Sequence, residues 1–273
     1  MIVSCIPLMF DQRYLRLRSG RKGEDRMDGA KAAGNERGRG GLTPVARETL
    51  HDRVYAELRR SLIHGVFVSG EMLRIQDLAE KLRTSTMPVR EALARLVSEQ
   101  ALEALPNRSV RVPVITREKL EDLARARVLI EGEVTARALE NLGPEDFARL
   151  TALTHECEAA FRVRSEDNIR RATELNHAFH DHIYKAAGSP VLLPMIESLW
   201  LQSGPYVHAA AFLHDEARDP AGTHHHWELI AALERRDASG AVAALTRDVT
   251  RAFNLLRGKL DAEEASLRTE QNG

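Results

Sequence analysis

The sequence predicts a mainly α-helical protein, with a small β-hairpin near the end of a three-helix N-terminal part and an all-helical bundle after it. Three observations predict this. Residues 73–100 have the spacing of two short amphipathic helices joined by a tight polar turn. The stretch after them alternates apolar and basic residues, as a hairpin strand with one solvated face does. From residue 116 onward the apolar spacing is helical, and no strand pattern returns.

Composition limits the class of protein. A chain of 273 residues is long enough for two domains with their own cores. Its two cysteines, Cys5 and Cys157, indicate a reducing cytoplasm rather than a disulfide scaffold. No apolar run approaches the roughly eighteen residues of a membrane span, so we expect no membrane partner. Residues 1–112 carry 20 Lys and Arg against 14 Asp and Glu, whereas residues 113–273 carry 19 against 26. A basic front and an acidic back favour a nucleic-acid module joined to a part that does not touch nucleic acid.

Residues 1–43 are expected to be a disordered tail. Residues 18–41 are rich in glycine and charge, a composition that cannot build a core. The apolar run at residues 2–10 has no basic residues before it, which argues against a secretory signal. Met27 would serve as a start codon as well as Met1 does.

The first helix is expected over residues 44–66. One stripe of it carries Leu50, Val54, Leu58 and Leu62, and the pair His64-Gly65 ends it. Ser69-Gly70 then turns the chain toward the helical hairpin.

The two helices of the hairpin have features suited to reading DNA. Thr84, Ser85 and Thr86 supply a turn and N-cap hydroxyls, and Pro88 falls in the first turn of the second helix. Thr86 and Arg90 begin the outward face of that helix, the position from which side chains reach base edges in a major groove. From this stretch alone, an ordinary amphipathic hairpin is an equally good interpretation.

The residues after the hairpin favour the DNA-binding interpretation. A turn at residues 106–109 precedes Val110, Arg111 and Val112, which alternate apolar and basic. Three helices followed by a hairpin with a basic tip make a winged helix-turn-helix, whose wing would bring Arg108 and Arg111 near phosphates. We therefore predict a DNA-binding domain over residues 44–113.

These residues also carry a resemblance to a known family. The run LAEKL…TSTMPVREALARLVSEQAL resembles the helix-turn-helix signature of the GntR family of bacterial transcription regulators, and the match covers about sixty residues. The resemblance implies that Arg90 contacts DNA.

The chain departs from the family pattern at four positions. Thr86 and Met72 stand where the family usually has arginines, Met87 where it has a threonine, and Ser109 where it has a wing glycine. The loss of two arginines predicts a changed operator sequence and weaker binding. Arg74, two residues after Met72, is expected to substitute in part.

The second part of the chain, residues 114–262, is expected to be an all-helical domain that ends before a disordered tail at 263–273. Gly and Pro breaks divide it into helices at 117–141, 144–165, 168–187, 190–206, 221–236 and 238–261. The stretches ELNHAFHDHIYKAAGSPVL and HWELIAALERRDASGAV resemble the C-terminal FCD domain of the FadR-type branch of the GntR family. The resemblance implies a helical sensor that binds a small effector, usually an organic acid, and often a divalent metal ion.

The resemblance also implies a metal site. Asn176 and His180, four residues apart on one helical face, are grouped with His226 and Asp248 from later helices. Family members typically have a third histidine at the last of these positions. Two imidazoles, a carboxylate and an amide suit Mn or Ni and would bind Zn less tightly. The alternative is that both histidines are core residues satisfied by hydrogen bonds.

Two further features invite an interpretation. Arg127 matches the family's effector pocket, where a guanidinium can hold a carboxylate bidentately. The alternative is a surface ion pair with Glu131, four residues on. In the run His224-His225-His226 at most one ring can face an internal site, so the other histidines are expected to be solvated.

The expected function is that of a cytoplasmic homodimeric transcription regulator, a repressor that binds a palindromic operator and responds to a small organic acid. One competing interpretation is a metal-dependent helical-bundle enzyme fused to a DNA-binding head. The absence of a partnered nucleophile and of a phosphate-cradling glycine loop argues against it. Two more interpretations stay open, namely a metal-responsive regulator without an organic effector and an architectural DNA-binding protein.

Overall fold

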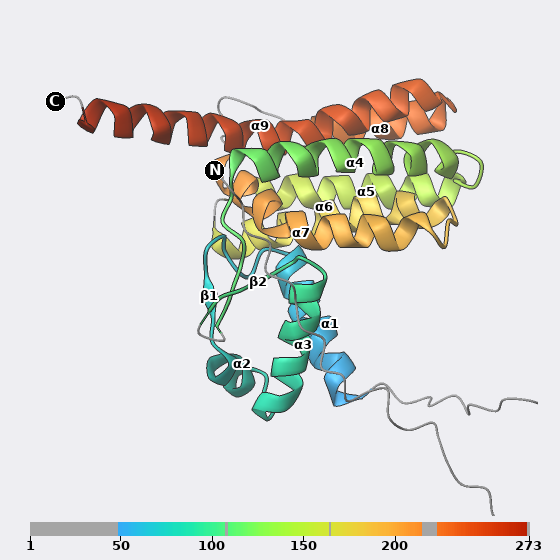
Figure 1. Ribbon diagram of the computed structural model, residues 1–273. Helices are drawn as coiled ribbons and strands as arrows, with labels where there is room; N and C mark the ends of the chain where they lie inside the picture. The colour runs from blue at the N-terminus through green and yellow to red at the C-terminus, as the bar shows by residue number, and fades with distance from the viewer. Residues whose placement is uncertain (1–48, 107–108, 164, 215–222, 272–273) are drawn as a thin grey trace, which may run out of the picture. The chain divides into compact units, whose positions relative to one another are not determined.

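The computed structural model describes residues 49–106, 109–163, 165–214 and 223–271 (Figure 1). The chain divides into two units, Met1–Ala46 and Arg47–Gly273, and everything described here belongs to the second. The predicted tail 1–43 and the wing residue Arg108 lie outside the described residues.

The first part of this unit, called the head from here on, contains three helices. They are α1 (Leu50–Ile63), α2 (Ile75–Lys81) and α3 (Thr86–Ser98). Thr49 begins α1 with a capping box, in which its hydroxyl accepts from the Asp52 N–H and Asp52 accepts from the Thr49 N–H. That cap gives α1 a later start than the 44–66 range predicted. The apolar stripes of all three helices meet in one core, and α1 packs against α3.

The wing is a three-stranded sheet rather than the hairpin that was predicted. Its strands β1 (Met72–Leu73), β2 (Glu103–Ala104) and β3 (Val110–Arg111) are antiparallel in the order β1-β3-β2. Leu73 pairs with Val110 and Ala104 pairs with Val110 from the other side. A two-residue strand such as β1 has no alternation to detect, and it exists because β3 offers it an edge.

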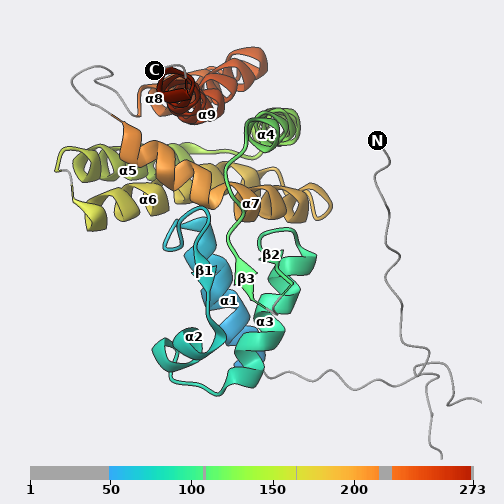
Figure 2. The same ribbon diagram turned by 60° about the vertical axis from the view of Figure 1, so that its left-hand side comes forward.

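The second part, called the bundle, contains the helices α4 (Arg117–Ala138), α5 (Pro144–Phe161), α6 (Glu166–Ala186), α7 (Leu192–Leu213), α8 (His224–Glu234) and α9 (Ala238–Gln271). Figures 1 and 2 show them lying roughly alongside one another, and α4 and α9 pack together, as do α5 and α6. Among the described residues, no helix is long and apolar enough to cross a membrane.

Two helices are longer than the sequence predicts. α7 continues to Leu213 instead of ending near 206, because Pro205 is accommodated inside the helix. α9 continues to Gln271, so the predicted end at 261 and the unstructured tail from 263 are wrong. Residues 259–271 contain no proline or glycine to break the helix, and most are good helix formers.

The head packs on the bundle through α1 and α7. Gly204 of α7 lies so close to the end of α1 that a Cβ there would be 2.2 Å from the Leu62 carbonyl oxygen. Gly65 adopts φ +70° directly after α1, against the side chain of His208. Beside these close contacts, Arg59 of α1 forms an ion pair with Glu197 of α7 at 3.0 Å.

Gly204→Ala is therefore expected to loosen the contact between head and bundle. Its Cβ would meet backbone atoms of Leu62 and Ile63, which cannot rotate away, so we expect a loss of about 1–3 kcal/mol in unfolding free energy. Gly258→Ala in α9 is the control, since a Cβ there meets nothing within 4 Å and should stabilise by about 0.5–1 kcal/mol. Urea denaturation measures both, and equal effects at the two positions would contradict the close packing.

Candidate functional site

The N-terminal end of α3 presents an exposed polar face. Ser85, Thr86 and Arg90 are exposed, whereas Val89 and Ala92 on the opposite side are buried in the head core. Arg74 is exposed as the N-cap residue of α2. This is the arrangement by which a recognition helix offers side chains to base edges while the helix before it faces the backbone.

Two of the predicted DNA-binding residues differ from expectation. The Thr84 hydroxyl is buried and has no hydrogen-bond partner among the described residues, so it does not belong to the exposed face. The Arg111 guanidinium donates to Glu103 of the neighbouring strand, with Nη2–Oε2 at 2.7 Å and Nε–Oε2 at 3.2 Å. Glu103 lies directly opposite Arg111 in the sheet, so it partly neutralises this arginine, a pairing that sequence spacing does not reveal.

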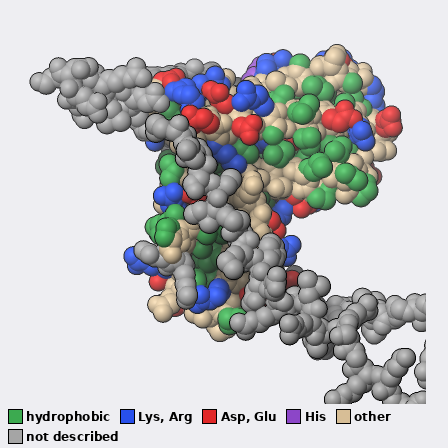
Figure 3. All heavy atoms as spheres, viewed as in Figure 1, with side chains coloured by type: hydrophobic (Ala, Val, Ile, Leu, Met, Phe, Trp, Pro, Cys, Tyr) green, Lys and Arg blue, Asp and Glu red, His purple; other side chains and the backbone are tan. Residues whose placement is uncertain are grey.

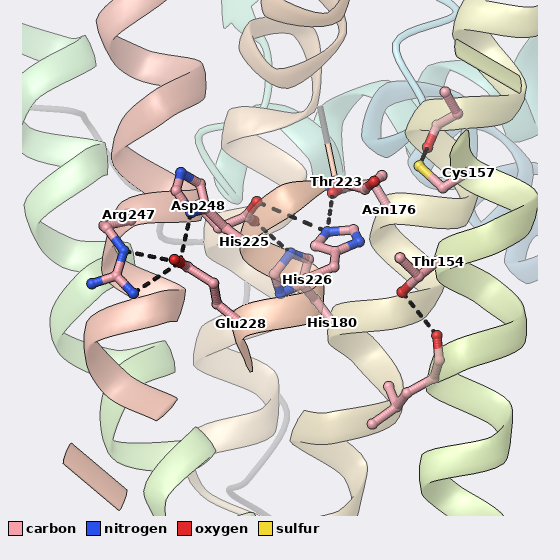
Figure 4. A network of polar contacts seen from close by, with 12 residues as sticks. Thr154, Cys157, Asn176, His180, Thr223, His225, His226, Glu228, Arg247 and Asp248 are labelled. Atoms are coloured by element: carbon pink, nitrogen blue, oxygen red, sulfur yellow. Dashed lines mark hydrogen bonds and ion pairs between the residues drawn. The ribbon is translucent and has the colours of Figure 1, made fainter. Parts of the chain in front are cut away.

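The four predicted metal ligands converge inside the bundle (Figure 4). Asn176 and His180 come from α6, His226 from α8 and Asp248 from α9. His180 Nε2 lies 2.9 Å from Asp248 Oδ2, and His226 Nε2 lies 3.0 Å from Asn176 Oδ1 and 3.9 Å from Asp248 Oδ1. Both histidines are 1% exposed, and Asp248 is 11% exposed.

The hydrogen bonds around His180 determine where its proton lies. The Tyr184 hydroxyl has a single proton and donates it to Glu131 Oε2 at 2.5 Å. Its oxygen can then only accept from His180 Nδ1, at 3.2 Å, which places a proton on Nδ1. Nε2 consequently faces the Asp248 carboxylate either protonated, as an imidazolium, or with a bare lone pair that requires a cation beside it. Ligand histidines are oriented in this way by a partner on the second ring nitrogen.

The electrostatics of the cluster favour a cation. Burial lowers the pKa of His226 to about 4, so its ring is neutral near pH 7, and its Nδ1 is buried with no hydrogen-bond partner among the described residues. Burial opposes ionisation of Asp248, but His226 and the hydrogen bond from His180 outweigh it and hold the Asp248 pKa below its usual range. A neutral imidazole and an ionised carboxylate are the protonation states that a metal ion requires.

The donor atoms also fit one ion. The nearest ligand atoms of His180, His226 and Asp248 lie within 4.8 Å of one another. Two ligands at about 2.1 Å from an ion and at right angles lie about 3 Å apart, which matches the two shortest separations. Nitrogen and oxygen donors of this kind suit Zn, Ni or Mn. The residues present therefore fit a divalent ion.

Arg127 lies in the same interior but is not free. Its Nε and Nη2 donate to the two carboxylate oxygens of Glu131 at 2.7 and 3.3 Å, and its guanidinium lies 4.2 Å from the Trp200 ring centroid. Both partners are almost fully buried, so the ion pair with Glu131 forms as one of the two interpretations expected, but not on the surface. Burial opposes the charge on Arg127, and Glu131 outweighs it, leaving the pKa raised.

A cavity of about 60 Å³ adjoins both Arg127 and the ligand cluster. Its lining includes Asn176 and Asp248, and it also includes Arg251, which sequence reasoning missed. Arg251 follows Asp248 by three residues on α9 and therefore shares its helical face, a signal that the spacing could have given. Arg251 Nη2 contacts His214 Nδ1 at 2.7 Å. The cavity thus combines two arginines with the proposed ligands, a setting suited to an anion beside a cation.

A row of aromatic rings connects this interior to the head. His180 packs on Trp200 with ring centroids 5.6 Å apart, Trp200 on His177 at 4.8 Å, and His177 on His64 at 5.6 Å. His64 is the C-cap residue of α1. The end of the first head helix is therefore two ring contacts away from Trp200.

The remaining histidines of the run 224–226 lie elsewhere. His224 and His225 contact Glu228 at 3.2 and 2.9 Å, and Glu228 also accepts from Arg247 at 2.8 Å. His224 is 60% exposed, in agreement with the expectation that it is solvated, and His225 is less so, at 19%. Because Arg247 already holds the carboxylate, this group is less suited to a metal ion than the buried cluster.

Comparisons with known proteins match both parts of the chain. Residues 50–112 match the family described as bacterial regulatory proteins, gntR family, and residues 122–251 match the FCD domain. The chain is 35% identical over 192 residues to the HTH-type transcriptional regulator McbR of Escherichia coli (strain K12), covering 69% of this chain and 84% of that protein. It is 30% identical over 152 residues to the HTH-type transcriptional repressor GlaR of the same organism, covering 54% and 67%.

Solved structures agree with the fold. The structure of E. coli McbR/YncC superposes with a TM-score of 0.71 at 31% identity, covering 78% of this chain and 99% of that one. A putative GntR transcriptional regulator from Rhodococcus sp. RHA1 gives a TM-score of 0.60 at 22% identity, covering 76% and 97%. At that identity the second comparison supports the fold alone.

The histidine between the head and the ligand cluster predicts an acid-sensitive fold. Burial, and then the neighbouring His64 and His180, lower the pKa of His177 to about 3. As pH falls below about 6.5, the unfolded chain takes up this proton before the folded chain does, so stability is lost from 6.5 downward. Between pH 6.5 and 5 we expect a loss of about 1–2 kcal/mol from this group.

Urea denaturation of the metal-free protein at several pH values measures this loss. His177→Phe keeps a ring between His64 and Trp200 and should make the profile flatter by that amount. The same substitution at the exposed His155 is the control. A His177→Phe profile as steep as that of wild type would show that this imidazole does not carry the effect.

Proposed function

Because the chain belongs to the GntR family of bacterial regulatory proteins, whose members are DNA-binding transcription regulators rather than enzymes, we propose that it is a repressor controlled from its FCD domain. A divalent ion and a small organic acid bound inside the bundle would set the affinity of the head for its operator. The observation that carries this proposal is the convergence of Asn176, His180, His226 and Asp248 on one buried point beside two arginines. The name of the relative GlaR supports the repressor role.

We assign residues 44–113 to the DNA-binding domain and 114–262 to the effector-binding and dimerisation domain. The first assignment surrounds the matched range 50–112 and the second surrounds 122–251. The protein would act in the cytoplasm, where bacterial DNA lies.

A homodimer is part of the proposal because two heads related by a two-fold axis would read a palindromic operator. Support comes from exposed apolar side chains on the bundle. Leu129 of α4 is 72% exposed, and Met195 of α7 is 49% exposed, on helices that contact each other. Figure 3 shows hydrophobic side chains gathered on the bundle in this region. Apolar surface of this kind is typical of a face that a second subunit covers.

Within the head, we propose that Ser85, Thr86 and Arg90 read or flank base edges and that Arg74 holds a phosphate. All four are exposed at the N-terminal ends of α2 and α3. Arg111 would contribute less than an unpaired arginine, because Glu103 holds its guanidinium.

Arg90→Ala is expected to weaken operator binding by about 1–3 kcal/mol and to reduce discrimination against unrelated sequences. Arg137→Ala removes the same charge from an exposed position on α4, in the bundle, and is the matched control. Fluorescence anisotropy with the operator and a scrambled duplex measures both quantities. Unchanged affinity and selectivity in Arg90→Ala would show that α3 is not the recognition helix.

The metal assignment predicts about one divalent ion per chain after loading with Zn, Ni or Mn. The ion would draw the ligands of three helices together and give an anion a positive centre to bind. A His180→Ala, His226→Ala double variant should lose the ion, whereas a His224→Ala, His225→Ala double variant should keep it. Elemental analysis compares the two. Retention in the first variant would contradict the assignment, and loss in the second would move the site to the surface of α8.

The effector assignment predicts that small carboxylates raise the melting temperature of the metal-loaded protein, because they bind only the folded state. Arg251→Met should lose this response, since a carboxylate in the cavity would lie beside that guanidinium. Arg247→Met, one helical turn earlier and exposed, should keep it. Metal binding without any carboxylate response would favour the second candidate, a metal-responsive regulator with no organic effector.

A further inference from the structure

A second, larger cavity lies between the head and the bundle, apart from the ligand cluster. It measures about 800 Å³, within the range of small-molecule sites. Its walls come from the loop after α1, from the linker that leads into α4, and from α6, α7 and α9 of the bundle. No residue of the metal cluster lines it, and neither Arg127 nor Arg251 does.

The apolar lining is unusually exposed for a folded chain. Val68 of the head loop is 57% exposed, Val114 of the linker 46% and Phe212 of α7 46%, and all three face this cavity. Leu256 and Leu260 extend the apolar wall along α9. Exposed apolar groups from three segments gathered around one hollow indicate a site for an apolar molecule.

The charged groups of the lining determine which apolar molecule fits. Arg170 and Lys259 contribute two positive charges and Glu166 one negative charge. Arg170 donates to Asp167 at 3.0 Å, but Asp167 is 89% exposed, so this is a weak surface pair that another carboxylate can replace. Burial lowers the pKa of His208, whose ring therefore adds no charge near pH 7. The lining favours an anion with an apolar body.

We propose that this cavity binds a small molecule with an apolar ring or short chain and one carboxylate or similar anionic group, its anion directed to Arg170. The site is separate from the effector cavity inside the bundle and does not depend on the proposed metal. Because the head and the bundle both line it, a bound molecule would fix their relative position. The cavity is thus a second place from which a ligand can act on DNA binding.

The test uses two fluorescent probes that differ in charge. Both 1-anilinonaphthalene-8-sulfonate, an anion, and N-phenyl-1-naphthylamine, its neutral counterpart, brighten in apolar sites. Titration of the full chain should give saturable binding of the anion. Arg170→Gln should weaken the anion about five- to tenfold and leave the neutral probe unchanged, since one charge-assisted contact is lost.

Filling the cavity provides the second arm. Ala209 of α7 lines it, and Ala209→Trp should weaken both probes about tenfold or more. Ala56→Trp is the matched control, because Ala56 lines a different groove between α1 and α7. If Ala209→Trp unfolds the chain, as circular dichroism would reveal, Val114→Ser replaces it and should weaken both probes in the same direction.

Three results would overturn the proposal. Equal binding of both probes to wild type and Ala209→Trp would place them elsewhere. Equal weakening of both probes by Arg170→Gln would mean that the arginine supports the fold rather than holding an anion. A change of oligomeric state in Ala209→Trp, seen by light scattering, would mean that a second copy of the chain covers the groove.

Discussion

The ion pair of Arg127 and Glu131 in the bundle interior is the interaction on which the site depends. Two charges this deeply buried are costly unless each is fully paired, and removal of one partner typically costs about 3–5 kcal/mol. Glu131 is satisfied by Arg127 and by the Tyr184 hydroxyl together. That second bond fixes the orientation of Tyr184 and, through it, the proton on His180 Nδ1. The ligand nitrogen that faces Asp248 is thus prepared by a charge pair one layer behind it.

The same interior reaches the DNA-binding head by packing. Trp200 contacts both Arg127 and His180, and on its other side it packs against His177, which in turn contacts His64 at the end of α1. Close-packed interiors transmit small displacements because they leave little empty space to absorb them. The glycines at 65 and 204 bring the head near enough for this to matter. A shift of Trp200 therefore has a short route to α1, in addition to the covalent route through the linker into the wing.

The sequence predicted the helices of the core well, and it failed where tertiary contacts decide. The stripes of α1 and α3 and the spacing of Asn176 and His180 are local patterns, so they could be read directly. The strand β1 and the pairing of Arg111 with Glu103 depend on which strands meet, which periodicity does not encode. Arg127 was grouped with the pocket correctly, since it lines the cavity. Its pairing with Glu131 was foreseen only as a surface contact, because burial of a charged pair is decided by the whole bundle.

The buried metal centre is the central claim, and anomalous diffraction from metal-loaded crystals tests it most directly. Data collected at the absorption edge of the loaded ion locate it without reference to any mutation. The account predicts one strong peak per chain, at about 2.0–2.3 Å from His180 Nε2 and His226 Nε2 and beside the Asp248 carboxylate. A peak confined to the surface group of His224, His225 and Glu228, or no peak inside the bundle after loading, would contradict it.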